Sequence, residues 1–454
     1  MITELKNLQN KKGFIKYFKN TSWLFTERIF RITIGLFVSM WMARYLGPDK
    51  FGFLSYTLCF VGLLGFIAAG FDGIVQKELL NNEKSNDEVM ATAFWLKIIG
   101  NLLGIIAVFS ISKNFTSNDA YENTLVLIVA SSTIFHSFKV IDYYFQAKVM
   151  SKLIVYANII SLFLSTVVKI ILILNQAPLI AFVWVVFFDN FILASGFIYF
   201  YIKYNLTFRI KNSKFNGKIA IILIRHSWPL MLTSAAIMTY MSIDQVMIKE
   251  MINSEAVGQY AAAARISGAW NFIPTAIAVS VFPAIINAKK KSENLYQTRI
   301  QKLNDIMVWI SLAIAIPVTF LSDQIIELLY GSQYSEAGSV LMIHIWSGVF
   351  VFLAVANERW IICENLQKFL AINTIIAAIV NIGLNYILIP KFGIEGAAWA
   401  TLISYCLAGY LCLLIWKKTR ISFINLTKSL LLITVLKKKY RWNIKHILKS
   451  KHLL

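Results

Sequence analysis

Charged side chains interrupt the long apolar runs of this sequence, and their types indicate what they could bind. A charged residue at the centre of a bilayer costs about 2.5–3.5 kcal/mol on insertion scales. Such residues are therefore expected to face the protein interior, to pair, or to line water. The basic members are Arg28, Arg31, Lys97, Lys139, Lys169, Arg225 and Arg265, and the acidic members are Glu27, Asp72, Asp142, Asp189 and Asp244. Because the bases outnumber the acids, a cavity lined by them would suit an anion.

Helical spacing places several of these residues on shared faces. One polar stripe follows steps of three or four residues: Ser132, His136, Lys139, Tyr143 and Gln146. Residues so spaced are neighbours on a helix surface. This pattern favours a hydrated cavity between helices over a lipid-facing surface.

The candidate residues divide into two groups. The candidate contacts for an anionic substrate are Arg28, Arg31, Lys97, Lys139, Arg225 and Arg265. The candidates for ion coupling or for lining a polar cavity are Glu27, Asp72, His136, Asp142, Asp244 and Asn381. Arginine suits phosphate because its planar guanidinium presents a fork of donors. No catalytic residue, metal ligand or cofactor is predicted.

Structural roles remain open for several candidates. Arg31 could pair with Glu27, and Lys139 could pair with Asp142, each within about one helical turn. Arg225 could be an interfacial anchor, and Lys169 could extend its ammonium group to the membrane surface. His136 could be a structural, hydrogen-bonding histidine. Arg28 and Arg265 have no obvious partner one turn away, so they are the preferred substrate contacts.

The elements that must position these residues are membrane helices. The chain has 454 residues, of which 58% are hydrophobic and 15% charged, against roughly 25% charged in soluble domains. A membrane helix needs about 20 mainly apolar residues. We expect about twelve, near residues 23–44, 52–77, 89–111, 122–146, 153–174, 178–202, 219–248, 257–287, 304–329, 337–360, 367–389 and 394–416. The predicted fold is an all-α polytopic membrane protein.

The positions of the basic residues predict how these helices are oriented. The net charge is +21, with 44 Lys and Arg residues. With both termini in the cytoplasm, roughly three-quarters of them lie in cytoplasmic segments and only a few in the opposite loops, as the positive-inside rule requires. The basic excess therefore needs no nucleic-acid partner. The basic segment 417–454 contains an apolar stretch, 421–436, which is either a helix on the membrane surface or an unstructured tail.

An internal repeat divides the chain into two lobes. Residues 361–390 align without gaps over 145–174, at an offset of 216, and Gly52 of DKFGFLSY pairs with Gly258 of EAVGQYAA. The predicted parts are a basic N-terminal segment (1–22), an N-lobe (23–202), a basic linker (203–218), a C-lobe (219–416) and the tail (417–454). Two six-helix lobes in the same orientation imply a pseudo-two-fold axis along the membrane normal, with a site between them.

Other chemistry is not indicated. The four cysteines form no CxxC or Cys/His cluster, and the sequence has no GxxxxGK[ST] loop, HExxH or nucleophile elbow. No loop between the predicted spans is long enough for a soluble catalytic domain. A transporter is therefore favoured over an enzyme.

Two segments resemble a known family. ERIFRITIGLFVSMWMARYLGPDKFGFLSY (27–56), with its ARYLGP…G pattern, and ILIPKFGIEGAAWATLIS (387–404) are similar to polysaccharide and O-antigen flippases of the multidrug/oligosaccharidyl-lipid/polysaccharide exporter superfamily. The resemblance covers almost the whole chain. It implies two lobes around a V-shaped cavity that opens alternately to each side, with basic residues, here Arg28, Arg31 and Arg265, contacting the pyrophosphate and sugar.

The resemblance also implies a substrate and a location. Family members move undecaprenyl-diphosphate-linked oligosaccharide repeat units from the inner to the outer leaflet of the bacterial cytoplasmic membrane, for polysaccharides such as the O-antigen of lipopolysaccharide. The expected partners are that lipid-linked oligosaccharide, the bilayer and other glycan-assembly membrane proteins. The alternatives are a drug or cation antiporter of the same superfamily, which should have an acidic cavity, and a membrane glycan polymerase, which should have a large outward loop.

Overall fold

The computed structural model describes residues 12–65, 70–81, 86–115, 119–204 and 215–431, and within these ranges the chain forms helices and no strand. The helices of the first half are α2 (Lys12–Leu64), α4 (Asp72–Asn81), α5 (Asn86–Phe115), α6 (Ala120–Ser132), η2 (Thr133–Phe138), α7 (Lys139–Ala147), α8 (Ser151–Leu174) and α9 (Leu179–Tyr204). Those of the second half are α10 (Gly217–Met251), α11 (Ser254–Ala269), α12 (Phe272–Lys291), α13 (Glu293–Phe320), α14 (Ser322–Tyr330), η3 (Ser332–Tyr334), α15 (Ala337–Cys363), α16 (Gln367–Gly409), η4 (Leu411–Leu414) and α17 (Arg420–Leu430). The predicted all-α membrane fold is confirmed.

Ten helices of the described chain are long and apolar enough to cross a membrane. Two of these bend at a glycine with positive φ beside or near a proline, at Gly47 in α2 and Gly393 in α16. Glycine adopts this left-handed conformation without the steric penalty of other residues. The first predicted run and part of the second therefore lie on α2, and the eleventh and twelfth lie on α16. The count of twelve separate spans stays a prediction.

Several predicted spans are not continuous α-helices. The eighth is divided between α11 and α12, and the ninth between α13 and α14. In the second, α2 ends at Leu64 and α4 begins at Asp72, with 66–69 outside the described residues. In the fourth, η2 separates α6 from α7. Hydroxyl groups explain that change, because Ser131, Ser132 and Thr133 each donate to the carbonyl three residues earlier, at 2.7–2.8 Å.

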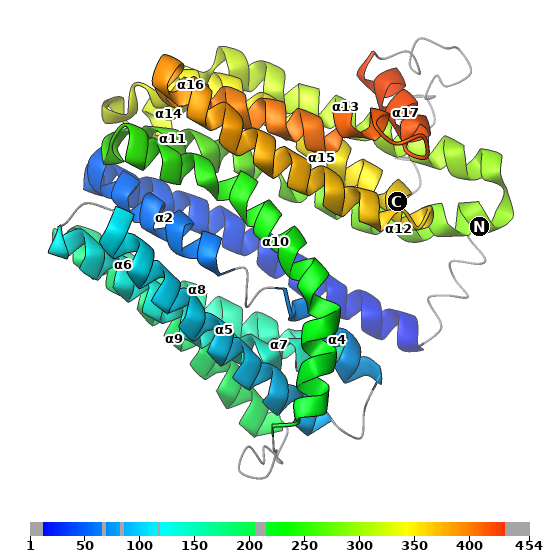
Figure 1. The fold of residues 1–454 in the computed structure, drawn as a ribbon, viewed down its shortest axis with the longest axis horizontal. Coiled ribbons are helices and arrows are strands. Elements are labelled where there is room, and N and C mark those ends of the chain that lie inside the picture. The colour runs from blue at the N-terminus through cyan, green and yellow to red at the C-terminus, as the bar shows by residue number, and fades with distance from the viewer. Residues whose placement is uncertain (1–11, 66–69, 82–85, 116–118, 205–214, 432–454) are drawn as a thin grey trace, which may run out of the picture.

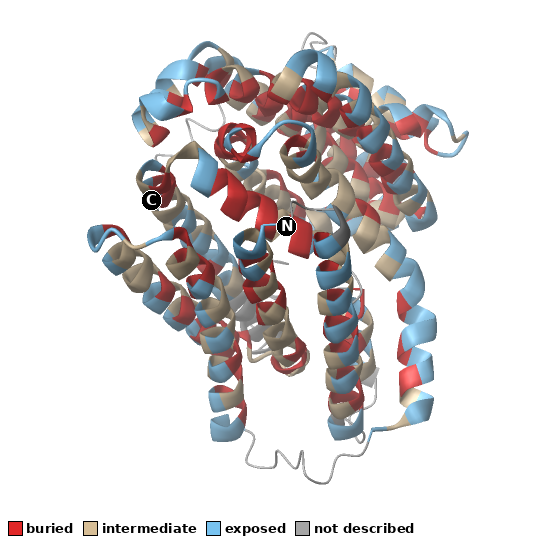
Figure 2. Ribbon diagram, turned by 60° about the vertical axis from the view of Figure 1, so that its left-hand side comes forward, coloured by how far each residue is buried: buried red, intermediate tan, exposed pale blue. Residues whose placement is uncertain are grey.

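The helices form two groups (Figure 1). Helices α4 to α9 make the N-terminal group and α11 to α16 the C-terminal group, while α2 and α10 run between them. Exposed residues follow the outer faces of the helices, and many are large and apolar, including Phe37, Phe163 and Phe320 (Figure 2). An apolar outer surface suits a lipid environment.

One turn of the backbone repeats at the offset of the sequence alignment. Val149, between α7 and α8, has a φ of 58°, and Asn365, between α15 and α16, has a φ of 56°. Both turns contain the same backbone bonds, since Met150 N donates to Phe145 O and Leu366 N to Ile361 O, at 2.8 and 3.0 Å. Positive φ is uncommon outside glycine, so this shared turn supports the predicted repeat in this region.

The stretch predicted at 421–436 forms α17, which ends at Leu430; residues 432–454 lie outside the described chain. The helix packs on α13 and α15. Leu426 is fully buried against Val308, Leu353 and Leu413. This part of the tail is therefore a docked helix and not an unstructured segment.

Candidate substrate-binding site

At one end of the molecule the two helix groups are joined through α2 and α10. Lys249 at the end of α10 pairs with Glu122 at the start of α6, with 3.2 Å between Nζ and Oε1. The hydroxyl of Tyr56 in α2 donates to Glu250 Oε1 at 3.1 Å. We call this end, which holds residues 43–57, 119–122, 249–259 and 322–334, the closed end.

Several bonds at the closed end are made to backbone oxygens. Arg44 Nη2 donates to Leu328 O at 2.5 Å, and Gln333 Nε2 donates to Arg44 O at 2.8 Å. The Tyr334 hydroxyl donates to Ala43 O at 2.9 Å. Burial raises the pKa of Tyr334, because the phenolate would lose its hydration, so the hydroxyl keeps the proton that it donates. These bonds tie α2 to the α14–η3 segment.

Two glycines allow α2 and α11 to touch through their backbones. A Cβ on Gly52 would lie 1.8 Å from Ser254 O and 2.5 Å from Gly258 N. A Cβ on Gly258 would lie 2.0 Å from Pro48 O. No side chain fits at either position without separating the helices. These are the two glycines that the internal sequence alignment pairs.

Arg265 of α11 reaches across to α2 beside this contact. Its Nη1 donates to Ser39 Oγ and its Nη2 to Ser55 Oγ, the latter at 3.2 Å. The guanidinium lies 4.5 Å from the centroid of the Phe51 ring. Within the described chain it forms no ion pair with a carboxylate. The guanidinium charge is therefore stabilised by neutral hydroxyl acceptors and by the face of an aromatic ring.

The first half of α2 continues away from the closed end, with Arg28 and Ser39 on one face. The two positions differ by eleven residues, which is about three turns, or about 16 Å along the axis. Arg28 is exposed. Arg31 binds Glu27, with 2.7 Å between Nε and Oε1, so the predicted Glu27–Arg31 pair is formed. Arg28 therefore lies on the same face of α2 as Ser39, to which Arg265 donates, and is the second candidate cation on that face.

Lys97 is the most buried of the predicted basic residues, with 2% of its side chain exposed. Its Nζ lies 2.6 Å from Asp72 Oδ1 and 3.4 Å from the Tyr143 hydroxyl. The two partners are 25 residues apart, on α5 and α4, so helical spacing could not reveal the pair. A buried lysine that is paired in this way acts first as a structural ion pair.

The alternative pair between Lys139 and Asp142 does not form in the described structure. Asp142 instead accepts from Gln146 Nε2 at 2.7 Å, and Gln76 Nε2 lies 3.4 Å from Gln146 Oε1. Lys139 is half-buried at the start of α7 and makes no ion pair with a described carboxylate. The start of α7 therefore contributes a positive charge beside the Asp72–Lys97 pair.

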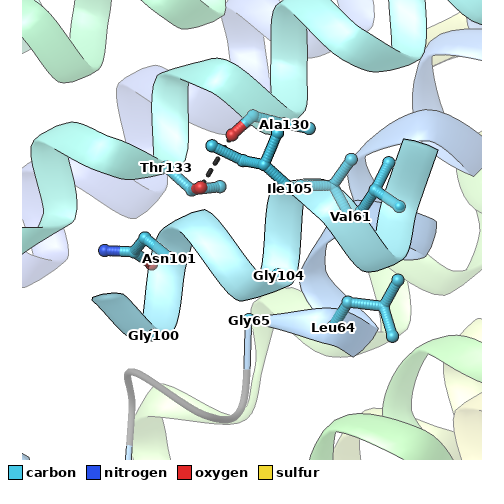
Figure 3. A pocket seen from close by; sticks show the side chains of 10 residues that line it. Val61, Leu64, Gly65, Gly100, Asn101, Gly104, Ile105, Ala130 and Thr133 are labelled. Carbon is cyan, nitrogen blue, oxygen red and sulfur yellow. Dashed lines mark hydrogen bonds between the residues drawn. The ribbon is translucent and has the colours of Figure 1, made fainter. Parts of the chain in front are cut away.

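His136 belongs to a neutral network. Its Nε2 lies 3.1 Å from Asn190 Oδ1, and Asn190 Nδ2 donates to Ser132 Oγ at 3.0 Å. Nearby, Asn101 Nδ2 donates to Ser137 Oγ at 3.0 Å. Figure 3 shows Asn101 and Thr133 beside a small hollow between α2, α5 and α6, which Gly65, Gly100 and Gly104 leave open. These contacts favour a structural role for His136.

Asp244 lies at the centre of a second polar cluster, in the C-terminal group. Only 3% of it is exposed. Asn385 Nδ2 donates to its Oδ1 at 2.5 Å, the Tyr260 hydroxyl donates to its Oδ2 at 2.8 Å, and Thr401 Oγ1 also donates to Oδ2. Asn381 Oδ1 accepts from Asn385 at 3.2 Å. The carboxylate forms no ion pair with a described cation, although buried charges are normally paired.

The remaining predicted residue, Arg225, is exposed on α10, far along the helix from Asp244. The structure thus places Arg265 against Ser39, on the face of α2 that carries Arg28, and gathers other candidates in two clusters, around Lys97 and around Asp244. Sequence reasoning missed the partners Ser39, Ser55, Tyr260 and Thr401. Hydroxyl residues are common in membrane helices, so only the tertiary fold distinguishes these four.

The fold defines a class of protein. It matches an inward-facing multidrug resistance transporter of the MATE family, with a TM-score of 0.69 at 13% identity over 88% of this chain and 96% of that one. It also matches the lipid II flippase MurJ in an inward closed conformation, with a TM-score of 0.65 at 17% identity over 91% and 93%. The chain is therefore a multi-pass membrane protein with the fold of these transporters.

Residues 41–339 match the family of polysaccharide biosynthesis proteins, and the chain belongs to that family. It is 29% identical to the probable low-salt glycan biosynthesis flippase Agl15 of Haloferax volcanii over 37% of this chain, which spans only 35% of that relative. It is 21% identical to the capsular polysaccharide biosynthesis protein CapF of Staphylococcus aureus over 86% of this chain and 96% of that one. The predicted superfamily is confirmed, and the matched proteins whose names state an activity are flippases or transporters, as predicted.

Proposed function

We propose that this protein moves an undecaprenyl-diphosphate-linked oligosaccharide from the inner to the outer leaflet of a bacterial cytoplasmic membrane. The observation that carries the proposal is Arg265, a cation at the junction of the two helix groups whose described partners are neutral. A diphosphate offers the charged acceptors that a guanidinium binds most strongly. The family's role in polysaccharide biosynthesis supports a glycan on that diphosphate.

In this proposal Arg28 and Arg265 act in succession. Arg28 lies about 16 Å along α2 from Ser39, to which Arg265 donates, and the Arg28 side chain tilts toward the start of the helix, as helical side chains do. One diphosphate is too short to contact both at once. Arg28 therefore meets the head group near the open end, and Arg265 receives it at depth, while the polyprenyl tail stays in lipid.

The proposed orientation has both termini in the cytoplasm. The asymmetry of basic residues supports it. The closed end then faces outward, and the cavity opens inward to the leaflet where lipid-linked glycans are made. The remaining cations, Lys139 and Arg225, contribute positive potential on that side.

Asp244 is the proposed coupling site. Its carboxylate is buried among hydroxyl and amide groups, and Asn385 Oδ1 beside it is buried without a partner among the described residues. Such an oxygen-rich site suits a proton or a small monovalent cation. Asp244→Asn should remove the dependence of transport on an ion gradient and leave diphosphate binding intact. A variant with unchanged gradient dependence would exclude this role.

The central test is transport in reconstituted vesicles. A fluorescent undecaprenyl-diphosphate-linked oligosaccharide is added to one leaflet, and its arrival in the other is read with a membrane-impermeable glycosidase. Arg265→Ala should reduce the rate about 10- to 150-fold, the value of one charge-assisted hydrogen bond, and Arg265→Lys less. Arg299→Ala is the matched control, because Arg299 is half-buried on α13 and donates to a backbone oxygen, Ala284 O, within the C-terminal helix group. Equal rates for Arg265→Ala and the control would overturn the proposal.

The alternative function is that of a multidrug exporter, because the fold is also that of a MATE transporter. It would require an accessible carboxylate for a cationic drug. Asp72 is 42% exposed but is already paired with Lys97, and Asp244 is buried. The same vesicles separate the two functions, because an exporter would move a lipophilic cation and ignore the lipid-linked glycan.

A further inference from the structure

Arg265 links the C-terminal helix group to α2, because α11 carries the guanidinium and both of its hydrogen-bond acceptors lie on α2. Ser39 lies before the bend of α2 at Gly47, and Ser55 lies after it. A single guanidinium on α11 thus holds both halves of α2. Phe51, fully buried, covers the guanidinium beside the contact of Gly52 with Gly258. The residue is therefore part of the closed end as well as a candidate ligand for the substrate.

The acceptors that hold Arg265 are replaceable. Both are neutral serine hydroxyls, and within the described chain no carboxylate pairs with the guanidinium. Hydrogen bonds to an ionised acceptor are about twice as strong as those between neutral groups. A diphosphate arriving from the open end would therefore compete well for the same Nη1 and Nη2 donors.

Opening the closed end must break the same bonds. The backbones of α2 and α11 touch at Gly52 and Gly258, so this end cannot open while the two helices stay in contact. Separating them moves Ser39 and Ser55 away from Arg265. The closed end and an anionic ligand consequently use the same donors, and each excludes the other.

We propose that Arg265 is the switch that couples substrate loading to opening of the closed end. This rests on the proposed function, since it takes the diphosphate as the ligand. In the closed state the diphosphate must displace two serines before it binds Arg265 fully. In the open state the donors are free, so the diphosphate binds that state more tightly. A ligand shifts a conformational equilibrium by its difference in affinity between the two states, and loading therefore favours opening. Ser39 and Ser55 are positioning residues in this scheme.

The test measures the width of the closed end directly. Spin labels are placed at Tyr121→Cys on α6 and Leu328→Cys on α14, two exposed positions on opposite helix groups, in a chain whose four native cysteines are replaced by alanine. The distance distribution is recorded in lipid nanodiscs with no ligand, with farnesyl diphosphate, and with farnesol. Farnesol carries the same tail without the anion.

Three results are expected. Without ligand, Ser39→Ala/Ser55→Ala should populate longer distances than the unaltered chain, whereas Ser195→Ala, which removes an exposed hydroxyl bonded only to Phe191 O, should not. Farnesyl diphosphate should lengthen the distances in the unaltered chain, and farnesol should not. By calorimetry, the double variant should bind farnesyl diphosphate at least several-fold more tightly, because the competing acceptors are gone. Ser39→Ala alone, at a half-buried position, should show the same trends to a smaller degree if the double variant does not fold.

Distances that stay unchanged in both serine variants would overturn the switch. Binding of farnesyl diphosphate to the unaltered chain without any lengthening would also overturn it, while leaving the proposed function intact. If the unaltered chain and the serine variants all fail to bind the diphosphate, the proposed function itself fails, and the switch fails with it. A merely structural role for the serines would lower stability but would not tighten diphosphate binding.

Discussion

The contact of Gly52 with the α11 backbone should respond sharply to one added methyl group. In Gly52→Ala the new Cβ would lie 1.8 Å from Ser254 O. An ordinary contact begins at 3.4 Å, so the two backbones must separate by about 1.6 Å. Overpacking of this kind costs about 1–3 kcal/mol. Because opening the closed end relieves the clash, the equilibrium should move about 5- to 150-fold toward the open form.

The distance between spin labels at 121 and 328 reads this shift, and the vesicle assay reads its effect on transport. Gly62→Ala on the same helix is the matched control, since its Cβ meets nothing within 4 Å. The control should keep the distance distribution of the unaltered chain. A Gly52→Ala protein with the original distances and the original transport rate would refute the reasoning, because the contact would then place no limit on the closed end.

Three further predictions follow from buried contacts. Asp72→Asn should leave Lys97, 2% exposed, without its counter-charge and lower the free energy of unfolding by about 3–5 kcal/mol. Adding Lys97→Met should restore much of that stability. An Asp72→Asn protein as stable as the unaltered chain would contradict the pairing. Leu426→Ala should cost about 2–5 kcal/mol in a thermal-unfolding assay if α17 docks as described, whereas no loss would mean that the helix leaves its site. Tyr334→Phe removes the bond to Ala43 O and should weaken the closed end by about 0.5–1.5 kcal/mol, seen as a longer 121–328 distance; an unchanged distance would show that this bond does not hold it.

Much of the fold could be predicted from the sequence, because each membrane helix carries its own hydrophobic signal. The breaks between helices could be predicted in part. The sequence placed breaks at residues 45–51 and 390–393, and there α2 bends at Gly47 and α16 at Gly393. The sequence did not indicate η2, because the hydroxyls of Ser131, Ser132 and Thr133 give no hydropathy signal. The repeated turn at Val149 and Asn365 shows what an internal alignment adds. Asparagine is one of the residue types that tolerate positive φ, but valine is not, so only the alignment with Asn365 indicates this conformation at Val149.

The candidate site was predictable in part, for a physical reason. Spacing within one helix suggested the pair of Glu27 with Arg31, which forms, and that of Lys139 with Asp142, which does not, since Asp142 accepts from Gln146 instead. Pairs between helices depend on packing that a single sequence does not carry, as Lys97 with Asp72 illustrates. Arg265 has no partner one turn away in the sequence, and its described partners in the structure are neutral, so its role as a substrate contact stays a prediction. Sequence spacing could not indicate Ser39 and Ser55, which lie more than two hundred residues away.

The hydrogen bonds that hold the closed end together are made largely to main-chain oxygens. The donors to these carbonyl groups are the side chains of Arg44, Gln259, Gln333 and Tyr334. A carbonyl is present whatever residue supplies it. The acceptor residues can therefore change type during evolution without loss of the bonds, and selection falls on the four donors alone. A closed end built in this way can diverge in charge and shape while it keeps closing in the same manner.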